Sequence, residues 1–197
     1  MKGLIPFEPS SYYHIVNHAV GNENLFRTEE NFYFFLNKYS SYMPSVCDTF
    51  AYCLMPNHIH FLIRIHPEET LMAHHKYKRD FHKLVMQELS NLLNSYAKAY
   101  NKLYKRKGAL WIDFTKRFRI DSDSYLASTI NYIHQNPIKH GFVASPEDWK
   151  FSSFTSMVSD KPTLLKRKEV INWFGSNEDF LEFHKNESIV LIDELEY

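Results

Sequence analysis

The sequence predicts a protein of the α+β class, and three observations support that prediction. Segments rich in β-branched and aromatic residues alternate with segments whose apolar residues follow the 3.6-residue period of a helix. Hydrophobic residues make up 44% of the chain and charged residues 23%, with sixteen Phe and thirteen Tyr against five Gly. That composition is typical of a globular protein with a well-filled core. The length of 197 residues fits one domain with a small appendage.

The first part of the chain has the pattern strand, helix, strand, strand. Residues 12–20 (YYHIVNHAV) form the first predicted strand. Thr28 caps a predicted helix whose apolar face consists of Phe32, Phe35, Leu36, Tyr39 and Met43. Residues 48–55 form a second predicted strand, and Pro56-Asn57 is the expected turn into a third strand over residues 58–65.

The middle of the chain adds a long helix, a short strand and a final core helix. Apolar residues recur at helical spacing over residues 81–103, and a fourth strand is expected within 109–120. The final core helix is expected to start near Ser122 and to end at about Asn136, because Pro137 disfavours helix in the residue before it. The order β-α-β-β-α-β is the ferredoxin-like split βαβ plan, an antiparallel sheet with helices on one face and the other face available.

Two units are expected along the chain. Residues 1–155 form the main domain, and residues 156–197 form a short helical appendage packed on it. Two short helices are predicted at 166–174 and 177–185, separated by Gly175-Ser176. The appendage is too small to build a core of its own.

Charge is distributed unevenly along a chain whose formal net charge is zero. Residues 76–119 contain twelve Lys and Arg against three Asp and Glu, whereas residues 144–197 contain six against eleven. A basic middle beside an acidic tail indicates a polyanionic partner such as nucleic acid, although solvated helix faces explain the same pattern.

Neither a membrane location nor an oxidising compartment is indicated. No apolar run approaches the ~18 residues of a membrane span. The N-terminal MKGLIPFEPS lacks the apolar stretch of a secretory signal. Cys47 and Cys53 form neither a disulfide framework nor a metal-binding spacing. A cytoplasmic location is therefore expected.

The third predicted strand, HIHFLIRI, places two histidines outside the apolar face that the core needs. Side chains alternate between the faces of a strand, so the core face consists of Ile59, Phe61, Ile63 and Ile65. His58 and His60 project together from the opposite face, close enough to hold one metal ion. Histidines that are bonded to neighbouring strands explain the pattern equally well, and H-x-H alone does not decide. His14 and His18 share one face of the first strand, where they either line the open face of the sheet or form hydrogen bonds with neighbouring residues.

The final core helix carries a largely polar stripe beside its buried one. The buried stripe consists of Leu126, Ile130 and Ile133, and the second stripe of Tyr125, Thr129, Tyr132 and Asn136. Tyr132 and Asn136 are one turn apart, so a phenol and a carboxamide can face one site. A half-buried tyrosine with a solvated hydroxyl is the competing interpretation.

Two separated motifs, PNHIHFL (56–62) and YIHQNPIKHGFV (132–143), resemble those of the single-tyrosine HUH transposases. HUH stands for His, hydrophobic residue, His, which is His58-Ile59-His60 here. The similarity is to the branch of REP-associated tyrosine transposases (RAYT). It extends through AYCLMPNHIHFLIRI, SYAKAYNKLYKRKGALW and DWKFSSF, and it covers most of residues 12–155 in the family's order.

The resemblance implies a ferredoxin-like fold and a metal-dependent transposase or nickase that cleaves and rejoins single-stranded DNA with hairpin or repeat elements. Tyr132 is the implied nucleophile, which leaves a 5′-phosphotyrosine and a free 3′-hydroxyl. His58, His60 and Asn136 are the implied metal ligands. Mixed nitrogen and oxygen ligation suits Mg²⁺ or Mn²⁺ better than a closed zinc site. Dimers with shared sites occur among relatives, so a homodimer is expected as an alternative to a monomer.

Basic residues near the motifs are candidates for contacts with DNA phosphates, namely Lys98, Lys102, Lys105, Arg106, Lys107, Lys116, Arg117 and Arg119. Lys139 and His140, one turn beyond the site, are further candidates. Two other functions remain open. One is a domesticated single-stranded DNA-binding module without strand transfer. The other is an ordinary metallohydrolase that uses His58 and His60 with an activated water.

Overall fold

The computed structural model describes residues 5–185 of the chain. At its centre lies a four-stranded antiparallel sheet with the strand order β2-β3-β1-β4. Every pair of neighbouring strands runs antiparallel. The strands are β1 (Tyr12–His18), β2 (Cys47–Leu54), β3 (His58–Ile65) and β4 (Lys116–Ile120). This order and pairing confirm the predicted α+β fold and its split βαβ plan.

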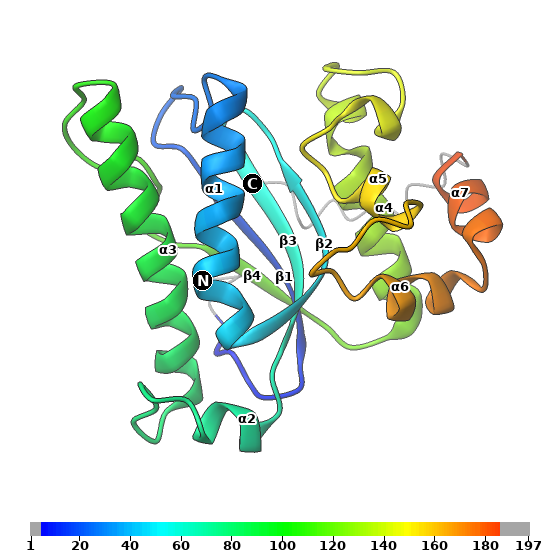
Figure 1. The fold of residues 1–197 in the computed structure, drawn as a ribbon, viewed down its shortest axis with the longest axis horizontal. Coiled ribbons are helices and arrows are strands. Elements are labelled where there is room, and N and C mark those ends of the chain that lie inside the picture. Colours follow the sequence, from blue (N-terminus) through cyan, green and yellow to red (C-terminus); the bar gives the residue numbers. More distant parts are fainter. Residues whose placement is uncertain (1–4, 186–197) are drawn as a thin grey trace.

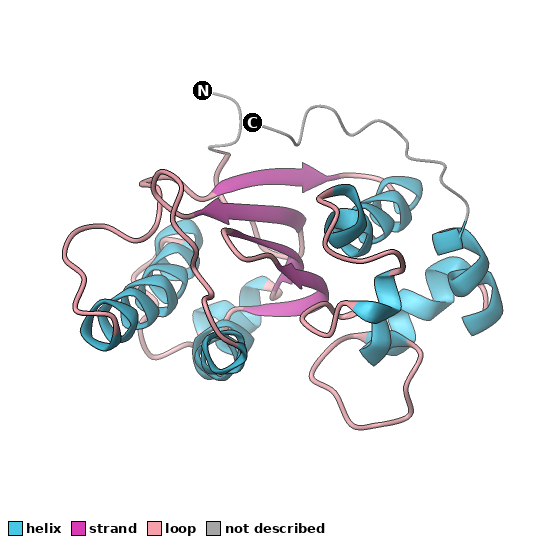
Figure 2. Ribbon diagram, turned by 90° about the horizontal axis from the view of Figure 1, so that it is seen from above, coloured by secondary structure: helices cyan, strands magenta, loops and turns pink. Residues whose placement is uncertain are grey.

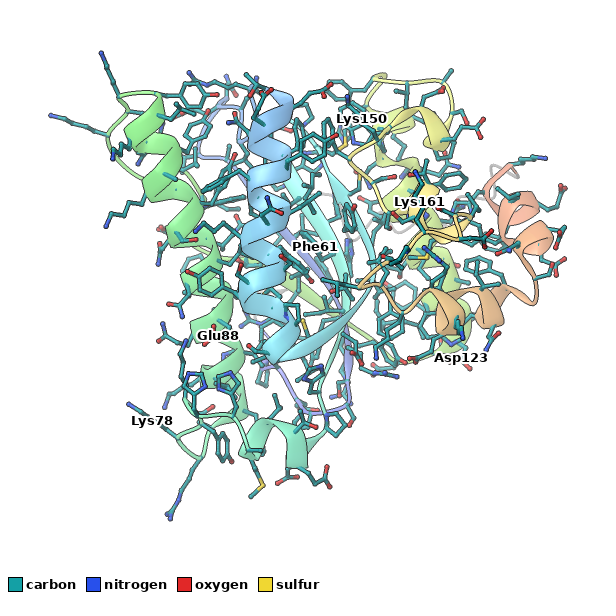
Figure 3. The ribbon with its side chains drawn as sticks, viewed as in Figure 1. Phe61, Lys78, Glu88, Asp123, Lys150 and Lys161 are labelled. Carbon is teal, nitrogen blue, oxygen red and sulfur yellow. The ribbon has the colours of Figure 1, made fainter. Side chains whose placement is uncertain are left out.

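Two long helices cover one face of the sheet (Figure 1). They are α1 (Glu29–Tyr42) and α3 (Phe81–Leu103), and the short α2 (Glu68–Met72) precedes α3. Phe61, labelled at the centre of the sheet in Figure 3, stacks on Tyr39 of α1 with 4.3 Å between ring centroids. Although α3 has 23 residues, it is amphipathic, and no helix within residues 5–185 is both long and apolar enough to cross a membrane.

The other face of the sheet is covered by α4 (Asp123–Lys139), as Figure 2 shows from above. Ile130 and Ile133 of α4 belong to the same buried cluster as Leu62 of β3. The expectation of helices on one face therefore holds for α1 and α3 but not for α4. The physical reason is that this second face also carries apolar side chains, such as Leu62 and Phe118, which have to be removed from water.

α4 continues through Pro137 instead of ending at about Asn136 as predicted. Pro137 has no N–H to donate to the carbonyl of Ile133. Neighbouring groups hold this turn: the side chain of Asn136 donates to the carbonyl of Tyr132 at 2.9 Å, and the N–H of His140 donates to the carbonyl of Asn136 at 3.0 Å. Pro137 is buried, so tertiary packing outweighs the local preference.

Three helices after α4 confirm the two predicted C-terminal helices and add a shorter one. They are α5 (Phe154–Met157), α6 (Arg167–Phe174) and α7 (Asn177–Lys185). Single 3₁₀ turns occur at Met43–Ser45 and Pro146–Asp148. Val170 of α6 and Phe180 of α7 are fully buried in the cluster that contains α4. The domain boundary at residue 155 stays a prediction, and residues 186–197 of the expected appendage lie outside the described part.

Candidate functional site

The pairing of β1 with β3 brings four histidines onto the face of the sheet that α4 covers. His18 pairs with His58, and Val16 with His60, while His14 pairs with Leu62. Because directly paired residues point to the same face, all four imidazoles lie opposite the face that packs on α1 and α3. The predicted orientation of His58 and His60 is confirmed. The alternative interpretation, that these histidines form hydrogen bonds with neighbouring strands, also holds for His60, which is hydrogen-bonded to His14 of β1.

α4 places the ring of Tyr132 against these histidines. The Tyr132 centroid lies 5.7 Å from that of His60 and 5.8 Å from that of His14, with the rings nearly perpendicular. Tyr132 is 6% exposed, so the ring is held within the site. All these groups belong to one chain. The fold therefore brings the predicted nucleophile beside the predicted ligand His60 of the same chain.

Asn136 joins the same site through its side chain. Its amide nitrogen is bonded to the carbonyl of Tyr132, and its side chain also forms a hydrogen bond with the ring of His58. On the other side of that ring, Nδ1 of His58 lies 2.8 Å from Oδ1 of Asn57. A neutral imidazole that donates from Nδ1 to this oxygen carries its lone pair on Nε2.

Burial keeps these imidazoles neutral. Desolvation lowers the pKa of His14 to about 3. Desolvation also lowers the pKa of His58 to about 3, with a smaller contribution from His18 and His140 that the hydrogen bond with Asn136 opposes. The pKa of His60 falls well below 6.5 for the same main reason. Neutral rings offer lone pairs at physiological pH, which a metal ligand requires.

His60 presents a nitrogen that the described residues leave unsatisfied. Its Nε2 atom is buried without a hydrogen-bond partner, whereas its Nδ1 atom lies 3.0 Å from Nε2 of His14. Within residues 5–185 no three His, Cys, Asp or Glu side chains converge to hold a metal ion, so a third protein ligand has to be of another type. The amide oxygen of Asn136 is of that type, and oxygen ligands suit Mg²⁺ and Mn²⁺. The donor set present therefore fits a divalent cation.

Lys139 and His140 lie closer to the site than their sequence position suggested. Nζ of Lys139 lies 4.4 Å from the centroid of the Tyr132 ring, which is a cation–π contact. The ring of His140 lies 5.1 Å from that of His58. The sequence contained a signal for Lys139, since residues seven apart lie two turns apart on the same face of a helix.

Four of the eight basic candidates are exposed at the C-terminal end of α3 and in the loop that follows it. They are Lys98, Lys102, Lys105 and Lys107. This loop leads back to the histidine end of β1, because the N–H of Ile112 donates to the carbonyl of His18 at 2.9 Å and Trp111 bridges to Ala19. The four lysines therefore lie near the same end of the sheet as the site.

Two of the arginine candidates are held in ion pairs. Arg106 pairs with Glu23 and also donates to backbone carbonyl groups of its own loop. Arg119 pairs with Glu8 and, at 2.8 Å, with Asp121. These contacts give both arginines a role in holding the loops.

The last two candidates lie within β4 on opposite faces of the sheet. Arg117 is 5% exposed and donates to the carbonyl of Ile5 on the α3 side. That position does not support the predicted contact with DNA. Lys116 pairs with Val16 on the histidine face. Desolvation lowers the pKa of His18 to about 4, and the charge of Lys116 adds to this shift.

Known proteins resemble this chain in sequence and in fold. No family model matches the chain. A Haemophilus influenzae protein named as a REP-associated tyrosine transposase is 28% identical over 135 residues, which cover 65% of this chain and 73% of that protein. A solved structure of a REP-associated tyrosine transposase bound to a REP hairpin matches with a TM-score of 0.59 and 17% identity, over 80% of this chain and 86% of that one. In sequence and in fold, the chain is therefore RAYT-like, as its two motifs predict.

Proposed function

We propose that this protein is a metal-dependent transposase or nickase that cleaves and rejoins hairpin-bearing single-stranded DNA through a 5′-phosphotyrosine at Tyr132. The observation that carries the proposal is that Tyr132 packs against His60 and Asn136 is bonded to Tyr132 in the same chain, while Nε2 of His60 is buried without a hydrogen-bond partner among residues 5–185. The relative solved with a REP hairpin supports a structured single strand as the partner.

The chemistry is a transesterification at one phosphodiester. The phenolic oxygen of Tyr132 forms a bond to phosphorus while the bond between phosphorus and the 3′ oxygen breaks. The phenol loses its proton, and the leaving 3′ oxygen gains a proton to become a hydroxyl. The covalent intermediate conserves the energy of the broken bond, so the reverse step joins strands without ATP. His58, His60 and Asn136 would hold a Mg²⁺ or Mn²⁺ ion, which would supply polarisation of the phosphate and offset charge in the transition state.

The chain's own residues orient the reacting groups. His58, His60 and Asn136 are the proposed cation ligands, and Tyr132 is held against His60 by the packing of α4. The ammonium of Lys139 over the Tyr132 ring stabilises negative charge on the phenolic oxygen. Lys98, Lys102, Lys105 and Lys107 are the proposed phosphate contacts, which gives salt-dependent binding.

One gel tests this function. Hairpin-bearing single-stranded DNA, labelled so that either product is visible, is incubated with the protein and Mn²⁺ or with EDTA. The expected result is a covalent protein–DNA adduct that requires Mn²⁺ and is lost in Tyr132→Phe. An adduct in Tyr132→Phe equal to that of the wild type contradicts the assigned nucleophile.

The same gel separates the two competing functions. A domesticated binding module binds the DNA with or without EDTA and gives no cleavage at any metal concentration. A metallohydrolase releases a product with a 5′-phosphate and leaves no adduct. A homodimer also stays a prediction. Sedimentation of the protein with and without DNA tests it.

A further inference from the structure

His14 and His60 form a buried pair in which each ring keeps one nitrogen without a partner. Nε2 of His14 lies 3.0 Å from Nδ1 of His60, and the ring planes are 18° apart. His14 is 0% exposed and His60 is 3% exposed. The outer nitrogens, Nδ1 of His14 and Nε2 of His60, are both buried without a hydrogen-bond partner among residues 5–185.

Only one hydrogen lies between the two rings, and its position decides whether His60 can act as a ligand. If Nδ1 of His60 donates to His14, the lone pair of His60 lies on Nε2. If His14 donates instead, the neutral His60 carries its hydrogen on Nε2, which blocks ligation. Each arrangement leaves one buried N–H unsatisfied. Without a cation, the two arrangements therefore differ little in free energy. A cation at Nε2 of His60 selects the first arrangement.

We propose, building on the proposed function, that His14 is a positioning residue for the divalent cation. It accepts a hydrogen bond from Nδ1–H of His60, fixes the orientation of that ring and leaves the Nε2 lone pair for the cation. Metal-ligating histidines commonly donate their second N–H to a carboxylate, a backbone carbonyl or water, and here a second imidazole takes that role.

The corresponding contact on the other predicted ligand supports this role. Nδ1 of His58 lies 2.8 Å from Oδ1 of Asn57, so both predicted imidazole ligands have a partner on Nδ1. His14 itself is fixed by β1, which lies between β3 and β4 in the sheet. The rings of Tyr132 at 5.8 Å and Phe118 at 6.1 Å pack around it and restrict its rotation.

Binding of Mn²⁺ by the metal-free full-length protein tests the role of His14, with titration followed by calorimetry and electron paramagnetic resonance. In His14→Phe, the acceptor is lost and the ring shape is kept, so affinity should fall by about 10- to 100-fold. In His14→Gln, Oε1 can accept in place of Nε2, so affinity should stay close to the wild-type value. Phe118→Leu separates packing from the hydrogen bond, because it loosens the packing on His14 and keeps the acceptor, so affinity should fall much less than in His14→Phe.

Long-range ¹H–¹⁵N spectra of ¹⁵N-histidine-labelled wild type give a second readout that needs no variant. With saturating Mg²⁺, His60 should show a protonated Nδ1 and an unprotonated Nε2. A protonated Nε2 on His60, or a folded His14→Phe that binds Mn²⁺ as tightly as the wild type, overturns the proposal. If the wild type forms the DNA adduct in either case, only the role of His14 is wrong. If the wild type binds no Mn²⁺, the metal-dependent function fails as well.

Discussion

At the scale of single residues, the surroundings of Tyr132 determine what its phenol can do. The ring contacts two imidazoles on one side and the ammonium of Lys139 on its face. The orientation of His58 and His60 could be predicted, because strand alternation is a local rule. The bond between His14 and His60 could not be predicted, because it depends on the pairing of β1 with β3, which no local pattern contains.

Lys139 gives a prediction at this scale. The substitution Lys139→Met removes the ammonium charge and keeps most of the alkyl chain. Negative charge on the phenolic oxygen of Tyr132 should then be less stabilised. A cation–π contact of about 0.5–2 kcal/mol corresponds to adduct formation slower by about 2- to 30-fold. Single-turnover rates at saturating DNA measure this effect separately from binding. Lys139→Arg should stay near the wild-type rate, and a Lys139→Met rate equal to wild type contradicts the role.

At the scale of elements, α3 carries the lysines that we propose for partner binding, and α4 carries the residues that we propose for chemistry. α4 carries Tyr132 and Asn136 against the histidines, and its extension past Pro137 brings Lys139 over the Tyr132 ring. The periodicity of α4 predicted the shared face of Tyr132 and Asn136. It could not predict the continuation, because the burial of Pro137 that offsets its missing N–H is a tertiary contact.

The exposed lysines of α3 give a prediction about salt dependence. If Lys98 and Lys102 contact phosphates, the double variant Lys98→Ala/Lys102→Ala should bind hairpin-bearing single-stranded DNA more weakly. The slope of log affinity against log salt should decrease by about 0.7–0.9 for each phosphate that the variant no longer neutralises. Fluorescence anisotropy between low and moderate salt measures both quantities.

A matched control for this prediction lies at the other end of the same helix. Lys83 is also exposed and pairs with Asp80 at 3.1 Å, far along α3 from Lys98. Lys83→Ala should leave both the affinity and its salt slope near wild type. An equal loss in Lys83→Ala and in the double variant would show that binding depends on general charge instead of on this end of α3.

At the scale of the whole molecule, a buried chain of hydrogen bonds ties α7 to α4. Nδ1 of His184 donates to the carbonyl of Phe180 at 2.7 Å, so neutral His184 accepts at Nε2 from Nδ1 of His134 at 2.9 Å. Nε2 of His134 in turn lies 2.7 Å from Oγ of Ser153. Both imidazoles have to be neutral for every bond in this chain to form.

The buried hydrogen bonds of His184 and His134 lead us to expect that the protein loses stability in acid. Burial lowers the pKa of His184 from 6.5 to about 4 in the folded protein. Below pH 6.5 the unfolded chain binds a proton that the folded protein excludes, so stability is full above 6.5 and falls as the pH approaches 4. The difference between the pKa of His184 in the unfolded and in the folded protein corresponds to on the order of 3 kcal/mol of unfolding free energy.

Urea unfolding of the wild type and of His184→Gln between pH 7.5 and pH 4 measures this contribution. The variant is expected to be less stable at pH 7.5, because it breaks the bonds to His134 and Phe180, but its stability should fall less steeply with acid. Equal slopes for the two proteins contradict the assignment of this pH dependence to His184.

The sequence predicted more of the fold than of the contacts within the site. The positions of β1, β2 and β3 and of α1, α3, α6 and α7 followed from periodicity and turn residues, which are local. The covered second face was not predicted, because Leu62 and Phe118 come together only in the folded sheet. Arg117 was misjudged for a related reason: a basic side chain in a charged segment is normally exposed, but strand parity turns this one toward α3.

The most direct test of the central claim is to identify the residue that carries the DNA. The adduct formed with Mn²⁺ and hairpin-bearing single-stranded DNA is digested with nuclease and trypsin, and the modified peptide is sequenced by mass spectrometry. A nucleotide attached through its 5′-phosphate to Tyr132 is the predicted result, with Tyr125→Phe of the same helix as a control that keeps the adduct. DNA attached to any other residue, or cleavage with no attached nucleotide, would contradict it.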